Sequence, residues 1–201
     1  MDRVNTGLRR LPVWVVYLLG AVPAALLLIG AFTGGLGVDP VKGLEHELGE
    51  WGLRFLIASL AVTPLMRVGL RLIRFRRALG LLGFWYVLAH FAVWVGLDMG
   101  LMWSQIAGDL VKRPYIMVGF GALLLLLPLA MTSSDRAVRR LGGQAWRNLH
   151  RLAYPAILAG AVHFVMIGKV WTADSLIYLG LTLALLALRL VPRRRLAPAR
   201  A

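Results

Sequence analysis

The sequence predicts an all-α membrane protein, a polytopic bundle of six transmembrane helices with both termini in the cytoplasm. Three observations lead to this prediction. Hydrophobic residues make up 59% of the 201 residues, and the mean hydropathy is +0.73, far above that of soluble domains. Six apolar segments each approach the roughly 20 residues that cross a bilayer core. Basic residues gather in alternate connections, and this asymmetry orients a chain in the membrane.

The expected spans are 11–33, 50–66, 78–97, 114–132, 150–168 and 174–191. No connection between them is long enough for a separate folded domain, so residues 1–201 are expected to form one domain. The first segment is too long for the apolar region of a secretory signal, which indicates a retained span. Pro23 inside it is compatible with a kinked membrane helix.

The formal net charge of +14 follows the predicted topology. Arginine clusters lie within residues 3–10, 67–77, 136–151 and 189–200, and an N-in chain places all four on one side. Far fewer basic residues are expected on the opposite side, where acidic residues lie between them. These basic residues are Lys42, Arg54, Lys112, Arg113 and Lys169. We therefore expect the arginines to set the topology and to contact anionic lipid, with no nucleic acid as partner.

Two absences narrow the possible chemistry. The chain has no cysteine, which excludes disulfides, cysteine-ligated iron–sulfur clusters, thiolate-ligated haem and covalently attached haem. It also has no glycine-rich dinucleotide fingerprint and no Walker-type loop, so it shows no nucleotide-binding domain of its own.

His90 and His163 each lie in the middle of an uncharged apolar span. Ionisable residues inside the membrane are costly and mark functional sites. Counted from the inner edge of their spans, both lie roughly 18–20 Å deep at 1.5 Å per residue. Equal depth on two helices predicts a pair of axial ligands for one metal, most plausibly the iron of a b-type haem. The alternatives are two histidines hydrogen-bonded to their neighbours, or a zinc or copper site, for which two histidines alone are a poor ligand set.

His150 is expected at the inner edge of the fifth span, beside Arg147 and Arg151. The matching level of the third span holds Arg77 rather than a histidine. His150 is therefore a candidate ligand of a second haem with a different partner, or part of a quinone or flavin site in which the two arginines bind phosphate, carbonyl or propionate groups. The remaining alternative is an interfacial histidine with local hydrogen bonds.

Arg54 lies about one turn inside the outer end of the second span, where an unpaired charge is costly. Two interpretations stay open. Arg54 either binds a haem propionate through a charge-assisted contact, or pairs with Glu50 four residues earlier on the same helix. His46, in the acidic outer connection, is expected to be exposed or to lie at the start of a helix.

Several stretches resemble a known family. They are GGLGVDPVKG at 34–43, TPL at 63–65, RRALGLLGFWYVLAHF at 76–91, KRPY at 112–115 and QAWRNLHRLAYPAILAGAVHF at 144–164. Together they are similar to the MsrQ family, the haem-binding membrane subunits of periplasmic methionine sulfoxide reductase systems. That family belongs to the wider group with a ferric-reductase-like transmembrane domain.

The resemblance implies an inner-membrane b-type cytochrome, an electron-transfer subunit rather than the catalytic one. It would pass electrons from the quinone pool, or from a cytosolic flavin reductase, to a periplasmic molybdenum-cofactor enzyme that repairs methionine sulfoxide. It also implies FMN as a cofactor, His90 and His163 as haem ligands, and His150 as the third family histidine. The alternative function is a proton-coupled transporter or channel with a histidine relay, although such relays usually include an intramembrane carboxylate.

Overall fold

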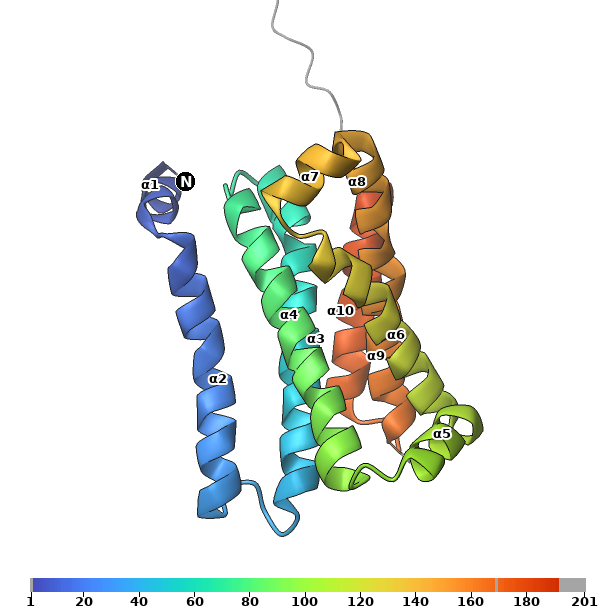
Figure 1. Cartoon of the computed structure of the whole chain (residues 1–201). Coiled ribbons are helices and arrows are strands. Elements are labelled where there is room, and N and C mark those ends of the chain that lie inside the picture. Colours follow the sequence, from blue (N-terminus) through green and yellow to red (C-terminus); the bar gives the residue numbers. More distant parts are fainter. Residues whose placement is uncertain (1, 169, 192–201) are drawn as a thin grey trace, which may run out of the picture.

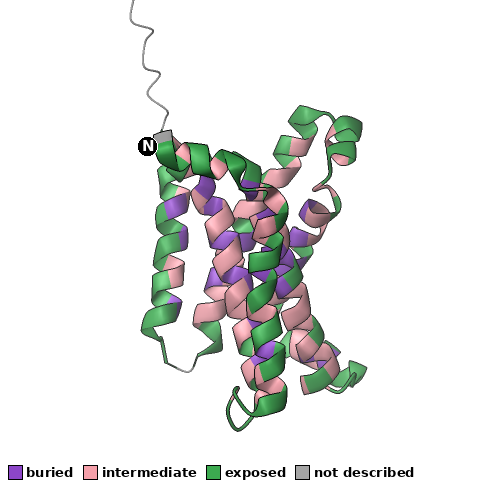
Figure 2. Cartoon of the chain, turned by 90° about the vertical axis from the view of Figure 1, so that its left-hand side faces the viewer, coloured by how far each residue is buried: buried purple, intermediate pink, exposed green. Residues whose placement is uncertain are grey.

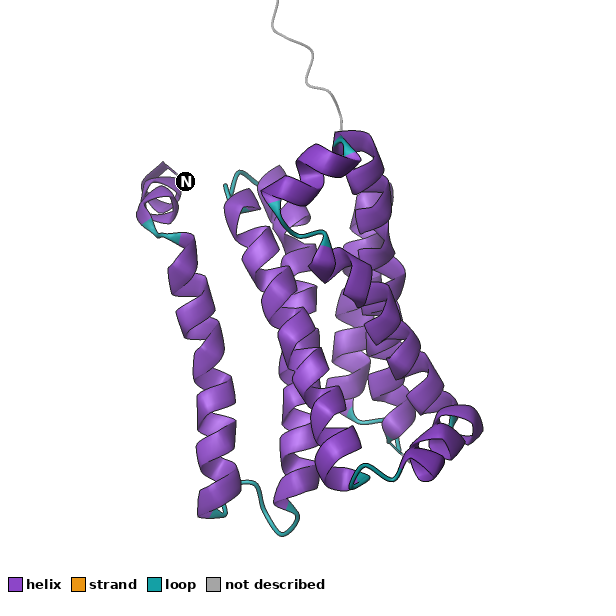
Figure 3. Ribbon diagram, in the orientation of Figure 1, coloured by secondary structure: helices purple, strands orange, loops and turns teal. Residues whose placement is uncertain are grey.

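The computed structural model describes residues 2–168 and 170–191, and every regular element within these ranges is helical (Figure 3). The all-α prediction is therefore confirmed. Lys169 and the arginines at 193–200 lie outside the described residues. The elements are α1 (Asp2–Arg10), α2 (Val13–Thr33), α3 (Pro40–Arg67), η1 (Ile73–Phe75), α4 (Arg76–Val93) with its π-helical extension η2 (Trp94–Asp98), α5 (Trp103–Lys112), α6 (Pro114–Met131), α7 (Asp135–Leu141), α8 (Gly143–Leu149), η3 (His150–Leu152), α9 (Ala153–Ile167) and α10 (Ala173–Leu190).

Five stretches of the described residues are long and apolar enough to cross a membrane. They are Val13–Thr33, Ile73–Asp98, Pro114–Met131, Gly143–Ile167 and Ala173–Leu190. The sixth expected span, 50–66, falls in α3, which begins earlier, at Pro40, and continues to Arg67. Because Glu50 and Arg54 interrupt its apolar part, α3 does not join the other five, and the six-span count stays a prediction.

The long helices form two antiparallel pairs (Figure 1). One pair is α3 with α4, and the other is α6 with α9. Helix α10 packs on α9 and α3, while α2 packs on α3 and α4 from outside. Much of α2 is exposed (Figure 2), as expected for a surface in contact with lipid. Its exposed apolar residues include Trp14, Leu18, Leu19, Leu26 and Ile29.

The α3–α4 contact is close because glycines face it. A Cβ added to Gly52 would lie 2.8 Å from Val87, and one added to Gly83 would lie 2.6 Å from Leu56. Small residues at such positions let membrane helices approach until their backbones nearly touch. This contact fixes α4, and with it His90, against α3.

The prolines inside the helices disturb the backbone ladder, and side chains of other helices repair it. Pro64 has no N–H to donate to the carbonyl of Leu60. Arg189, near the end of α10, donates to that carbonyl at 2.7 Å. The arginine therefore replaces the lost helical hydrogen bond and joins α10 to α3.

A hydroxyl plays the same part in α2, next to Pro23. The Tyr86 hydroxyl of α4 donates to the carbonyl of Gly20 at 2.7 Å and accepts from the N–H of Ala24 at 2.8 Å. These two backbone groups would bond each other in an unbroken helix. Tyr86 therefore bridges a missing backbone hydrogen bond of α2 and anchors α2 to the bundle.

Among the described residues, the arginines within 3–10, 67–77 and 136–151 and Arg189 lie at one end of the bundle, where α1, α7 and α8 are found (Figure 1). Hydrogen bonds and an ion pair connect segments there that are distant in sequence. The contacts are Arg67 with the carbonyls of Leu188 and Val191, Arg74 with that of Arg9, and Arg77 with the carboxylate of Asp135. We call this the arginine end; α5 lies at the opposite end.

Candidate cofactor site

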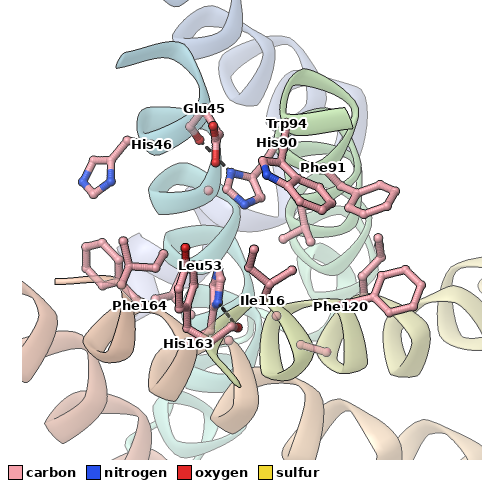
Figure 4. A pocket seen from close by; sticks show the side chains of 18 of the residues that line it. Glu45, His46, Leu53, His90, Phe91, Trp94, Ile116, Phe120, His163 and Phe164 are labelled. Carbon is pink, nitrogen blue, oxygen red and sulfur yellow. Dashed lines mark hydrogen bonds between the residues drawn. The ribbon is translucent and has the colours of Figure 1, made fainter. Parts of the chain in front are cut away.

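A cavity of about 550 Å³ lies among α3, α4, α6 and α9, toward the end opposite the arginines. This volume falls in the range of roughly 300–1,000 Å³ that is usual for cofactor and small-molecule sites. His90 and His163 both line it (Figure 4). Much of the remaining wall is apolar, including Leu53, Phe91, Phe120, Leu123 and Phe164.

The structure brings the two predicted histidines together. The ring centres of His90 and His163 are 6.2 Å apart, and the ring planes are inclined by 73°. Two imidazoles that ligate one metal from opposite sides have ring centres about 6 Å apart, because a metal–imidazole bond is about 2 Å long. Among residues 2–168 and 170–191, no group of three or more histidines and carboxylates lies close enough to hold a metal ion. Two imidazoles at this spacing are a donor set that a haem iron could use, since the macrocycle would supply its other ligands.

Backbone carbonyls fix the tautomer of both rings. His90 Nδ1 lies 2.7 Å from the carbonyl oxygen of Glu45, and His163 Nδ1 lies 2.7 Å from that of Tyr115 (Figure 4). A carbonyl can only accept, so each Nδ1 carries the hydrogen and donates. Each Nε2 then keeps its lone pair, which is the form in which histidine binds a metal.

His46 of α3 is exposed, as expected, but it also lines the cavity. Its ring lies 5.6 Å from that of Phe164, the residue that follows His163. It therefore belongs to the rim of the cavity and not to the histidine pair.

Two cations line the mouth of the cavity, and the sequence did not mark them as site residues. Lys42 Nζ lies 2.6 Å from Asp98 and 3.4 Å from Glu45. Burial lowers the pKa of Lys42, but the hydrogen bond to Asp98 and the charges of Glu45 and Asp98 raise it more, so the net shift is upward. Lys42 therefore stays a cation at neutral pH.

Arg113 is the second cation at the mouth. It lies 3.1 Å from Asp109 and 3.1 Å from the Tyr115 hydroxyl. A signal for both cations was present in the sequence, because each is a basic residue on the side expected to be outer, shortly before an expected span whose helix lines the cavity. The sequence pattern instead indicated Arg54 as a site residue, because its charge interrupts an apolar segment.

Arg54 has partners of its own. It donates to Glu50 and, at 2.8 Å, to the Tyr178 hydroxyl of α10, and its guanidinium lies 4.6 Å from the centre of the Trp51 ring. Glu50 lines the cavity, whereas Arg54 is not among the described residues that do. The geometry thus favours the Glu50 pair, one of the two interpretations of Arg54 left open by the sequence.

His150 lies apart from the histidine pair, toward the arginine end. Its ring stacks on Trp146 at 3.9 Å, and its Nε2 lies 3.1 Å from the Thr132 hydroxyl. Arg147 donates to Gln144 at 2.7 Å, and Arg151 is exposed. His150 therefore faces a threonine and a tryptophan rather than another histidine.

Comparison with known proteins identifies the class to which this fold and site belong. A family model described as "Ferric reductase like transmembrane component" matches residues 48–161. The match includes most of α3, α4 with His90, α6, and the first half of α9. The chain is thus a multi-pass membrane protein of the ferric-reductase-like class.

Curated relatives narrow the class to one family. A protein of Brucella anthropi is 49% identical over 180 residues, which cover 89% of this chain and 81% of the relative. A protein of Agrobacterium fabrum is 48% identical over 180 residues, covering 89% and 83%. Both are named "Protein-methionine-sulfoxide reductase heme-binding subunit MsrQ". The chain belongs to the MsrQ family.

Proposed function

We propose that this chain is a b-type cytochrome of the bacterial inner membrane that carries electrons to a periplasmic methionine sulfoxide reductase. The observation that carries the proposal is the pair of His90 and His163, which line one cavity with both Nδ1 atoms engaged by carbonyls. The name shared by the relatives, a haem-binding subunit of that reductase, supports it.

The residues of the cavity have distinct parts in holding haem b. His90 and His163 would hold the iron through their Nε2 atoms, and the apolar wall would exclude water. Lys42 and Arg113 at the mouth are placed to attract the two propionates, a task that we assign to them in preference to Arg54. A haem held in this way supplies a one-electron carrier inside the bilayer.

The donor and the acceptor approach opposite ends of the bundle in this proposal. The acceptor is a periplasmic molybdenum-cofactor enzyme that docks near the mouth of the cavity. The donor is the quinone pool or a cytosolic flavin reductase, with FMN as a further cofactor by family resemblance. Its site is proposed near His150, Arg147 and Arg151, which lie toward the arginine end.

The proposed arrangement in the membrane includes α3 as the sixth span. Its 28 residues give a length of about 40 Å at 1.5 Å per residue, more than a hydrocarbon core of about 30 Å needs. Pairing with Glu50 and Tyr178 lowers the cost of placing Arg54 within it. The arginine end faces the cytoplasm under the positive-inside rule.

The test of this proposal is the visible spectrum of the purified protein. We expect a Soret band and a sharp α-band on reduction, as for low-spin haem b with two histidine ligands. His90→Ala and His163→Ala should each abolish or convert this signal, because each removes one axial nitrogen. His46→Ala is the matched control and should leave it unchanged.

Two outcomes would contradict the proposal. A colourless protein from haem-replete cells would remove the cytochrome function and favour the transporter alternative. An unchanged low-spin spectrum in both His90→Ala and His163→Ala would show that the axial ligands lie elsewhere.

A further inference from the structure

Each imidazole of the pair packs against a glycine of a neighbouring helix. A Cβ added to Gly49 of α3 would lie 3.0 Å from His90 Nδ1. A Cβ added to Gly119 of α6 would lie 2.7 Å from both Nδ1 and Cε1 of His163. Distances below 3.0 Å are not tolerated between non-bonded carbon atoms, so an alanine at 119 requires the His163 ring to move.

The two glycines occupy equivalent positions relative to the carbonyls that bind the rings. Glu45 precedes Gly49 by one helical turn, and Tyr115 precedes Gly119 in the same way. In an α-helix, each of these carbonyls is the one that accepts from the glycine N–H four residues later. A carbonyl oxygen has two lone pairs, so it can also accept from an imidazole, provided that no side chain blocks the approach.

We infer that Gly49 and Gly119 are positioning residues that set the orientation of the haem ligands, an inference that rests on the proposed function. Each glycine leaves room for the ring beside the backbone and keeps the carbonyl of the preceding turn within its reach. The ring orientation follows from that contact, and with it the direction of Nε2. The same device occurs twice, once for each ligand.

The energetics of helices support a specific role. Glycine in a helix interior costs about 1 kcal/mol relative to alanine, so its presence beside each ligand is not explained by helix stability. Gly121, on the same helix as Gly119, has no atom within 4 Å of its added Cβ. It is therefore a matched control for the helical effect of glycine without the ring contact.

The experiment compares the wild-type protein with Gly119→Ala, Gly49→Ala and Gly121→Ala. Groups that hydrogen-bond and orient metal-ligating histidines typically contribute about 10–100-fold to metal affinity. We expect Gly119→Ala to lower haem affinity within this range and to change the low-spin signal in electron paramagnetic resonance. Gly49→Ala should act in the same direction but less strongly, because its contact of 3.0 Å is looser. Gly121→Ala should match the wild type.

The outcomes separate this inference from the proposed function. A wild-type protein without haem would defeat the proposed function itself. A wild-type protein with low-spin haem, and unchanged affinity and resonance signal in Gly119→Ala and Gly49→Ala, would overturn the inference alone. If Gly119→Ala does not accumulate as folded protein, Gly49→Ala decides by the same two measurements.

Discussion

At the scale of single residues, the three cations near the site differ in their position relative to the cavity. All three have partners: Arg54 bonds Glu50 and Tyr178, Lys42 bonds Asp98, and Arg113 bonds Asp109. Only Lys42 and Arg113 line the cavity, so an anionic ligand in it would meet these two cations rather than Arg54.

This difference gives a prediction for Arg113→Gln. Removing the cation should lower haem affinity by about fivefold or less, since an exposed ion pair is worth up to about 1 kcal/mol. The low-spin signature should stay, because the axial histidines are untouched. Haem titration of the purified protein measures the change, and Lys112→Gln, one residue away and exposed, is the control. A loss as large as that in His163→Ala would mean that Arg113 supports the ligands themselves.

His150 carries a separate prediction, about rate rather than binding. The histidine pair lies roughly 18–20 Å from the inner edge of the spans along the helix axes, so a cytoplasmic donor needs an intermediate step. We expect His150→Ala to slow haem reduction by that donor and to leave the spectrum of the bound haem intact. Stopped-flow reduction with haem quantitation tests this. Loss of all haem would instead make His150 a principal ligand.

The sequence predicted that His90 and His163 come close together, as their rings do, but it did not predict the contacts around them. Counting residues along two helices predicted the common depth of His90 and His163, because helical rise is constant. The glycine and carbonyl contacts depend on which helices become neighbours and on side-chain rotamers. The partner Tyr178 of Arg54 lies on another helix altogether, and no local pattern identifies it.

At the scale of the elements, side chains replace backbone hydrogen bonds that are missing near prolines. Tyr86→Phe should destabilise the protein by about 1 kcal/mol, since the carbonyl of Gly20 and the N–H of Ala24 both lose their partner. Thermal unfolding in detergent measures the effect. Tyr17→Phe, on the same helix as Pro23 and exposed, is the control. Equal stability of the two variants would show that Gly20 and Ala24 of α2 form their backbone hydrogen bond without Tyr86.

Helix α3 shows where reading hydropathy falls short. The apolar segment 50–66 marks only the part of α3 that suits a membrane, and the helix begins nearly three turns earlier, at Pro40. The start of α3 could have been predicted from the sequence, because an aspartate followed by a proline is typical of a helix N-terminus. In the structure, Asp39 caps the helix by accepting from the Lys42 N–H, and Pro40 is the first helical residue. The extension carries Glu45 and Gly49, so it matters for the site.

At the scale of the whole molecule, the orientation in the membrane is a prediction that rests on the distribution of arginines. We predict that reporter fusions near Arg71 and Arg140 are cytoplasmic and that a fusion near Asp109 is periplasmic. A fusion near Leu36, before α3, should also be periplasmic if α3 is a span. If the fusions at Leu36 and Arg71 lie on the same side of the membrane, α3 is not a span and the number of spans is five.

The order in which the helices leave the ribosome has a consequence for assembly. The four helices around the cavity are made in the order α3, α4, α6 and α9, and the two imidazoles lie on the second and the last of them. A nascent chain that has inserted α6 offers one ligand and a cavity without its fourth wall. If the chain binds haem as proposed, we expect capture to follow the insertion of α9, because a chain truncated before α9 lacks His163.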